Sequence, residues 1–387
     1  MQKIMILFHD SDIKSGGTGS MMDLVVEWKK MNQFDPICVF PKKRGSAIEY
    51  ALSHGIKVEY LRFYPVFIYT TLSLREELIM LMKRIIQFMV TLLNLPRASA
   101  MIKKNNIELV YTNTRTVLLG VYINKLYKIP HIWHIREYGM EDRGIKFLIS
   151  DHTYSKYFRR YTNYIVLISK SINKFYEQRF ALPCHKVVYD DVSSRYICTI
   201  KKEMEKPVKV LIAGTICEGK GQLEVVKAIL RVNEVEERVN LYIAGRCIER
   251  RYLEEIEALK KEHDRFEAIK ILGLVENMNE LRSQMDISIV ASRSEAFGRV
   301  TIEGMLSGLI VVGADCGGTS ELIENGRNGF LYKKGDITDL QNILDLILNF
   351  TPEEIYKIKT NGFKSALEFT KGRCAEETSK IIIGLLK

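Results

Sequence analysis

The chain has 387 residues, which exceeds one ordinary hydrophobic core and predicts two domains. Its 47% hydrophobic and 27% charged residues are typical of a soluble globular protein and exclude an intrinsically disordered one. The net charge of +10 is uneven, because residues 1–195 hold 29 Lys and Arg against 17 Asp and Glu, whereas residues 196–387 hold 28 against 30. The basic first half would attract nucleic acid, an anionic membrane or a diphosphate-bearing acceptor.

The cysteines and the first residues indicate the compartment. The seven cysteines are scattered and form no C-x-x-C pair, which is typical of reduced thiols and argues against a zinc site. Met1 is followed almost directly by an apolar strand, so we expect no signal peptide and a cytoplasmic protein.

A glycine-rich segment follows the first predicted strand. Residues 3–8 are apolar and predict a buried strand, and residues 21–31 predict an amphipathic helix. Between them, Gly16 and Gly17 would let a ligand approach the backbone closely. The segment lacks the G-x-G-x-x-G order of a dinucleotide site, and a plain turn is the alternative. Further strands are predicted at residues 35–40 and 57–61, with a helix at 45–54.

Residues 70–105 form a long apolar stretch that Lys83 and Arg84 interrupt. Charges at a bilayer centre are costly, which argues against a helix that spans a membrane. Basic residues beside apolar faces favour a helix that lies in the membrane interface. We therefore expect peripheral contact with an anionic membrane, and a core helix packed on the sheet is the alternative.

Polar residues follow the next two predicted strands, at 109–112 and 130–134. Asn113 follows the first of them, and His134, Arg136 and Glu137 stand at the end of the second. His131 and His134 are three residues apart on a strand and would face opposite sides, so a metal site is not expected. His134 is a candidate contact for a sugar hydroxyl, and a buried, internally satisfied histidine is the alternative.

A second series of strands begins after the linker predicted at residues 193–207. Strands at 208–213, 239–244, 268–272, 287–291 and 309–313, separated by helices, predict a second doubly wound sheet. Gly214 and Lys220 lie in a loop that follows the first of these strands. A lysine in such a loop can hold a phosphate, although the order of residues is not that of a Walker A loop. Arg246 ends the next strand and is a further cation for the same edge.

The segment from 289 to 321 holds two glutamates with seven residues between them. Glu295 precedes a helix predicted at 298–306, Glu303 lies within it, and Phe297 and Gly298 stand between them. The helix N-terminus suits a diphosphate, and carboxylates accept hydrogen bonds from sugar hydroxyls. We expect Glu295 to face the sugar and Glu303 the ribose. The alternatives are a capping or solvated Glu295 and a surface Glu303.

This ordered set, followed by Gly317, Gly318 and Glu321, resembles the signature of retaining GT-B glycosyltransferases of family four, the glycosyl transferases group 1. The resemblance implies an α/β fold with two Rossmann-like, doubly wound parallel-sheet domains that face each other across a cleft. Residues 1–195 would bind the acceptor and 196–371 the nucleotide-sugar, and residues 372–387 would form a helix that packs back on the first domain.

The resemblance also assigns roles to residues. Glu295, Lys220 and His134 would be catalytic, and Asn113, Arg136 and Glu137 would contact the acceptor. The donor would lie against Gly16, Gly17, Gly214, Lys220, Arg246, Glu295, Phe297, Gly298, Arg299 and Glu303.

The sequence departs from the family pattern at two places. Thr215 stands where the family has an arginine for the diphosphate, and we expect Arg299, at the start of the helix, to replace it. Asp190 and Asp191 stand where the family has Asn-Gly.

The implied activity is transfer of a sugar, with retention and without a metal or other cofactor, from a nucleotide-diphospho-sugar. The expected donor is a UDP-sugar, and the acceptor is a saccharide or a lipid-linked sugar of a bacterial surface polysaccharide. The alternatives are a GT-B-like nucleotide-sugar epimerase and a non-catalytic relative that binds a nucleotide-sugar. A nucleic-acid partner is not expected, because no aromatic and basic RNA-binding motif is present.

Overall fold

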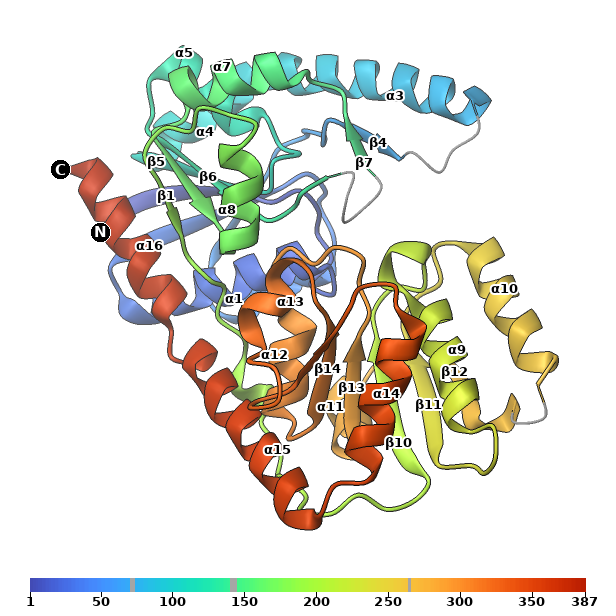
Figure 1. Ribbon diagram of the computed structural model, residues 1–387. Helices are drawn as coiled ribbons and strands as arrows, with labels where there is room; N and C mark the ends of the chain where they lie inside the picture. Colours follow the sequence, from blue (N-terminus) through green and yellow to red (C-terminus); the bar gives the residue numbers. More distant parts are fainter. Residues whose placement is uncertain (70–73, 140–144, 264–265) are drawn as a thin grey trace. The chain divides into compact units, whose positions relative to one another are not determined.

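The computed structural model describes residues 1–69, 74–139, 145–263 and 266–387, and these form two compact units (Figure 1). The first unit is Met1–Asp191 with Gly372–Lys387, and the second is Val192–Lys371. The boundary lies four residues before the predicted one. The reason is that Val192 N donates to Phe369 O at 2.7 Å and Ser307 Oγ donates to Tyr196 O at 3.2 Å, which ties residues 192–196 to the second unit.

The first unit is built on a parallel sheet with the strand order β3-β2-β1-β5-β6-β8-β9. Its strands alternate apolar side chains between two buried faces, as parallel sheets covered by helices do. In β1, Ile4 and Ile6 pack on one face, and Met5 and Leu7 pack on the other. The strand bounds are β1 (Gln2–Leu7), β2 (Phe34–Phe40), β3 (Lys57–Tyr60), β5 (Leu109–Asn113), β6 (His131–Ile135), β8 (Tyr164–Leu167) and β9 (His185–Val187).

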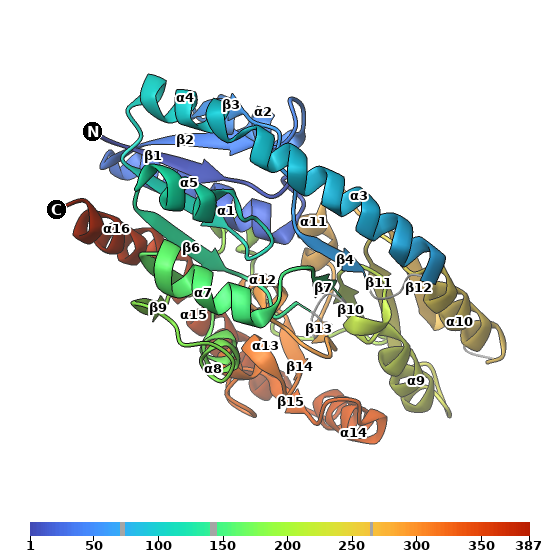
Figure 2. The ribbon, with the colours of Figure 1, turned by 90° about the horizontal axis from the view of Figure 1, so that it is seen from above.

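Helices cover both faces of this sheet (Figures 1 and 2). Side chains of α1 (Gly16–Met31), α2 (Ser46–Ser53) and α16 (Arg373–Leu386) join the cluster of Ile4 and Ile6. Side chains of α4 (Leu95–Asn105) and α5 (Leu119–Tyr127) join the opposite cluster. The indole Nε1 of Trp28 donates to Thr378 Oγ1 at 3.2 Å, which fastens α16 to α1. The remaining helices are α3 (Leu74–Leu93), α7 (Asp151–Tyr161) and α8 (Lys170–Glu177), and β4 (Phe67–Tyr69) pairs antiparallel with β7 (Ile145–Phe147).

Two predictions for this unit were wrong in detail. The segment expected to be a glycine loop is the first turn of α1, because the helix begins at Gly16 rather than at residue 21. Ser15 has an extended backbone just before it and ends the loop that follows β1. The apolar stretch expected at 70–105 contains two helices, α3 and α4, separated at Asn94, and its residues 70–73 lie outside the described part of the chain.

The second unit has a parallel sheet with the order β12-β11-β10-β13-β14-β15. Its strands are β10 (Val208–Ala213), β11 (Val239–Ala244), β12 (Ile269–Gly273), β13 (Ile287–Val290), β14 (Ile310–Ala314) and β15 (Phe330–Tyr332). Its helices are α9 (Gln222–Val232), α10 (Arg250–Lys261), α11 (Met278–Ser283), α12 (Arg299–Leu306), α13 (Gly317–Leu322), α14 (Ile337–Leu348) and α15 (Pro352–Leu367). The bounds of β10 and β11 confirm their prediction, whereas β15 has three residues and was not predicted.

Candidate active site

The strand order of each unit reverses beside its first strand. In the second unit, β10 lies between β11 and β13, and in the first unit β1 lies between β2 and β5. Ligands of doubly wound sheets bind at such switch points, outside the carboxyl ends of the strands. The loop after β10 holds Lys220 and the loop after β13 holds Glu295, so the topology brings these two predicted residues together.

Lys220 and Glu295 form an ion pair at this switch point. Lys220 Nζ lies 2.9 Å from Glu295 Oε2 and donates to Ser292 Oγ at 3.2 Å. Burial by itself raises the pKa of the Glu295 carboxyl, but the charge of Lys220 and hydrogen bonds from Lys220, Ser292 and the Gly298 backbone outweigh it and lower the pKa. Glu295 is therefore a carboxylate at neutral pH.

The pair sits at the start of α12. Gly298 is the N-cap with a φ of 91°, in the left-handed region that favours glycine. The carboxylate of Glu295 accepts a hydrogen bond from its backbone N–H. Glu295 therefore binds a backbone N–H at the start of the helix, as the alternative of a capping residue predicts. The same carboxylate also neutralises Lys220.

Two glycines allow the loops after β13 and β14 to touch. Gly318 N donates to Glu295 O at 2.6 Å, and a Cβ at Gly317 would lie 2.3 Å from the same oxygen. A Cβ at Gly318 would lie 2.3 Å from Phe297 O. The Phe297 ring is buried and packs edge-on against Phe369, so the side chain anchors the loop from inside the unit, and the donor contact of Phe297 stays a prediction.

Glu303 is buried and held by two arginines. Arg282 Nη2 donates to its Oε2, and Arg299 Nε donates to its Oε1 at 3.1 Å. The guanidinium of Arg282 also lies over the ring of Tyr196, 5.1 Å from its centroid. Arg282 was not predicted, because nothing in its sequence neighbourhood separates it from the other basic residues. Arg299 Nε is engaged one turn further along α12, and the place of Arg299 at the diphosphate stays a prediction.

A different cation lies beside Thr215. Ile216 N donates to Arg246 O at 2.9 Å, so the loops after β10 and β11 run next to each other. The side chains of Thr215 and Arg246 are both exposed. Gly214 has a φ of 150°. A Cβ at Gly245 would lie 1.7 Å from the carbonyl oxygen of Gly214, so the two loops approach closely because residue 245 is a glycine. Arg246 therefore stands next to the position where the family arginine is missing.

In the first unit, the residues predicted to contact the acceptor are buried in one hydrogen-bond network. Asn113 Nδ2 donates to Gly17 O at 2.9 Å, and its Oδ1 accepts from Arg136 Nε at 2.8 Å. Glu137 accepts from the backbone N–H groups of Arg115 and Arg136, at 2.6 and 3.1 Å. These polar groups hold the first turn of α1 and the end of β6, and their direct contact with an acceptor stays a prediction.

His134 belongs to the same network. Its Nδ1 lies 2.8 Å from Tyr111 Oη and 3.2 Å from Arg136 Nη2. Burial and the charge of Arg136 hold the pKa of His134 well below its ordinary value, so the ring is neutral. Asp190 accepts from Arg136 Nη1 and thus replaces the family's amide with a partner for a buried cation. The Nε2 of His134 is buried and has no hydrogen-bond partner in the described part of the chain, so the ring is satisfied only at Nδ1 and its sugar contact stays a prediction.

Two partly exposed polar residues that were not predicted, His9 and Asp10, lie at the switch point of the first unit. His9 Nε2 lies 3.1 Å from Asp10 Oδ2, and Thr18 Oγ1 donates to Asp10 Oδ1. A Cβ at Gly17 would lie 3.3 Å from His9 Cε1, so the pair borders the glycines at the start of α1. Gly16 has open space above it. The signal was available, since His9 and Asp10 directly follow the first strand.

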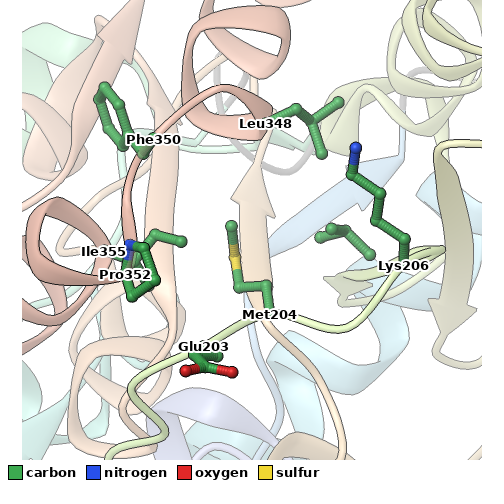
Figure 3. Close-up of a pocket in the computed structure, with 8 residues that line it drawn as sticks. Glu203, Met204, Lys206, Leu348, Phe350, Pro352 and Ile355 are labelled. Atoms are coloured by element: carbon green, nitrogen blue, oxygen red, sulfur yellow. The ribbon is translucent and has the colours of Figure 1, made fainter.

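The described residues contain no candidate metal cluster, and a pocket lies away from the predicted site residues. Within the described residues, no group of three or more His, Cys, Asp and Glu side chains is arranged to hold a metal ion. A pocket of about 190 Å³ lies elsewhere in the second unit (Figure 3). Val208 lines this pocket and is the first residue of β10, whereas Lys220 lies in the loop after β10. The pocket is therefore at the opposite end of the strands from Lys220.

The fold and part of the sequence match known glycosyltransferases. The structure of Anabaena Alr3699/HepE in complex with UDP and glucose has a TM-score of 0.78 at 18% identity, over 99% of this chain and 100% of that one. The two doubly wound units therefore have the GT-B fold, as predicted. Residues 207–349 match the family described as Glycosyl transferases group 1.

Relatives align over parts of their length. EpsD of Bacillus subtilis (strain 168) is 32% identical over 109 residues, which are 28% of this chain and 28% of EpsD. The O-antigen biosynthesis glycosyltransferase WclY of Escherichia coli is 23% identical over 155 residues, which are 38% of this chain and 42% of WclY.

Proposed function

We propose that the chain transfers a sugar from a nucleotide-diphospho-sugar to a saccharide or lipid-linked acceptor. The observation that carries this proposal is the pair of Lys220 and Glu295, which stands at a switch point and at the N-terminus of α12. Lys220 and the helix terminus supply positive charge where the diphosphate leaves, which is electrostatic stabilisation of the leaving group. In the bound complex Lys220 turns to the diphosphate, and the ionised Glu295 accepts hydrogen bonds from the sugar.

The transfer proceeds with retention. The acceptor oxygen bonds to the anomeric carbon on the face from which the diphosphate oxygen departs, and the acceptor proton passes to that leaving oxygen. Glu303 holds the ribose through oxygen lone pairs that its two arginines leave free, since each carboxylate oxygen accepts more than one hydrogen bond. The positive charge from Lys220, Arg246 and α12 makes the reaction independent of a metal or other cofactor.

The donor is a UDP-sugar. HepE, which shares the fold, is solved in complexes with UDP and glucose and with UDP-glucose, and these complexes support a uridine donor. His9 and Asp10 border the acceptor side, and the buried network around Arg136 holds the helix start beneath them.

We place the reaction in surface polysaccharide biosynthesis at the cytoplasmic face of the cell membrane. WclY, a relative over part of the chain, is named for O-antigen biosynthesis, which supports such an acceptor. The basic first half of the chain supports contact with an anionic membrane and an acceptor that carries a diphosphate.

Thermal unfolding with a panel of nucleotide-sugars tests the proposal. A donor at a hundred times its Kd should stabilise the folded state by about 2.7 kcal/mol, and Lys220→Ala should abolish the shift. Lys227→Ala is the matched control, because Lys227 is exposed on the neighbouring helix α9. The absence of a thermal shift with every nucleotide-sugar in the panel contradicts the proposal.

Product analysis separates the competing functions. A glycosyltransferase consumes the donor and releases the nucleoside diphosphate when an acceptor is present. An epimerase converts the donor without any acceptor, and a non-catalytic relative gives a thermal shift with no product.

A further inference from the structure

One face of α3 is an apolar stripe that the rest of the chain does not cover. Seven side chains along its 20 residues are each between 52% and 74% exposed. They are Leu78, Ile79, Met82, Ile85, Ile86, Met89 and Leu93. Large apolar side chains exposed side by side in this number mark an interaction surface rather than ordinary surface scatter.

The spacing places these residues on one side of the helix. At 100° per residue they fall within an arc of about 120°, and the helix is about 30 Å long. Lys83 lies at the border of this arc. The stripe is therefore a continuous band along α3, from its second turn to its end.

The other side of α3 is fixed to the first unit. Arg84 Nε donates to Phe67 O at 2.8 Å, and its guanidinium lies over the Phe67 ring. Thr91 Oγ1 accepts from Tyr64 N at 3.1 Å, and the ring of Phe88 packs near Tyr122 of α5. Arg84 thus points toward the protein and is not available to lipid, contrary to the expectation that both Lys83 and Arg84 flank a membrane face.

These contacts decide between spanning and lying on a membrane. Residues Arg75–Asn105 are long and apolar enough to cross a bilayer by length and composition. A spanning helix would have to expose Arg84 and Thr91 to hydrocarbon and lose their partners, which is costly. A helix with one packed face and one exposed apolar face instead lies parallel to the membrane plane.

Exposed cations flank the stripe. Tyr122 of α5 contacts Phe88 of α3 on one side and, through its hydroxyl at 3.1 Å, Tyr157 of α7 on the other, so the three helices form one layer (Figures 1 and 2). Exposed basic side chains on these helices are Arg75, Lys83, Lys125, Lys156, Arg159 and Arg160, and they outnumber the exposed acidic side chains of Glu76 and Asp151. Each such residue near an anionic surface contributes about 1 kcal/mol to binding.

We propose that the α3 stripe inserts into the interface of an anionic lipid bilayer, with the cations of α3, α5 and α7 against the headgroups. A second copy of the chain fits less well, because two such layers would bring like charges together. This inference rests on the proposed location at a membrane and specifies the surface involved. Vesicle binding is measured without donor or acceptor, so its result is independent of the proposed sugar transfer.

Cosedimentation with vesicles tests this surface. We expect the protein to bind vesicles of equal parts phosphatidylcholine and phosphatidylglycerol, and to bind pure phosphatidylcholine more weakly. The triple variant Ile79→Gln/Met82→Gln/Ile86→Gln should lower the partition coefficient roughly tenfold or more. A second variant, L78Q/I85Q/M89Q, samples the same stripe independently and should behave alike.

The matched control is L52Q/I248Q/L346Q, because these side chains are at least half exposed in other parts of the chain. It should bind vesicles as the unmodified protein does. Binding that is unchanged in both stripe variants overturns the proposal, as does an unmodified protein that stays in the supernatant. The protein could instead form a dimer by light scattering and fail to bind vesicles. If the stripe variants are then monomeric, the stripe is assigned to a second copy of the chain. Nucleotide-sugar thermal shifts on the same variants report on the proposed function separately, and we expect them to be unchanged.

Discussion

The backbone N–H of Gly318 donates to the carbonyl oxygen of Glu295 at 2.6 Å. The loop after β14 therefore supports the residue whose carboxylate pairs with Lys220. This support depends on the absence of a side chain, because a Cβ at Gly318 would lie 2.3 Å from Phe297 O.

Gly318→Ala should displace the loop that carries Glu295. Overpacking of this kind costs about 1–3 kcal/mol, and Gly318 has no positive φ, so the cost is steric. We expect a lower Tm. We also expect kcat/KM to fall by more than the fraction of unfolded protein explains. Gly384→Ala is the control, because open space surrounds Gly384 in α16 and alanine favours the helix. Equal behaviour of the two variants contradicts the support role.

Arg282→Met should leave the buried Glu303 with Arg299 alone. Removing one partner of a buried ion pair costs roughly 3–5 kcal/mol. We expect a large loss in the free energy of unfolding and a raised donor KM, since Glu303 would no longer be held in place. A double-mutant cycle measures the coupling of Glu303 to each arginine, and the coupling to Arg282 should be the larger. A larger coupling to Arg299, whose side chain is more exposed, would reverse this assignment.

Arg246→Ala should raise the donor KM more than Arg299→Ala does. The physical reason is that the Arg246 loop runs beside Thr215, whereas Arg299 is engaged with Glu303. Initial rates over a range of donor concentrations give the two values. Arg250→Ala serves as the control, because Arg250 is highly exposed on α10 and pairs within its own helix. If Arg299→Ala has the larger effect, Arg299 rather than Arg246 takes the place of the missing arginine.

Lys359 should make stability depend on pH at the alkaline side. It is buried in α15, and burial lowers its pKa from 10.5 to about 8, although Asp286 opposes the shift. The unfolded chain holds this proton between pH 8 and 10.5 while the folded chain does not, so stability rises with pH through that window and falls as pH is lowered through it. Below pH 8, the buried charge of Lys359 lowers the free energy of unfolding by about 3 kcal/mol.

Lys359→Met removes the titrating group. Urea unfolding at pH 7 and at pH 10 should show a variant that is more stable at pH 7 and that gains less between the two pH values. A parallel pH dependence in both proteins would mean that Lys359 is solvated in the folded state.

The sequence predicted what short-range patterns determine. The strands β10 and β11 are apolar runs bounded by polar turns, and the order of Lys220, Glu295 and Gly298 places them at one sheet edge once the strands are parallel. Long-range partners left no such pattern. Arg282 meets Glu303 across 21 residues, and Arg136 meets Asp190 across 54, so the identity of each partner depends on packing that a linear pattern does not contain.

The same limit applies to the hydrogen-bond network in the first unit. Polar residues at strand ends predict ligand contacts, and the structure adds that Asn113 and Glu137 satisfy backbone groups of Gly17 and Arg115. A buried backbone N–H or C=O needs a partner, and the strand end is where such partners are required. His9 and Asp10 occupy the equivalent place after β1 and remain partly exposed.

The last helix, α16, completes the core of the first unit, while the second unit is one continuous segment, Val192–Lys371. The second unit is thus an insertion within the first. During synthesis from the N-terminus, all of the second unit emerges before α16 does, and domains generally fold as units. The apolar surface of α1 and the Trp28 indole stay uncovered on the nascent chain until that late helix arrives, so the unit that comes first in the sequence is the last one able to finish folding.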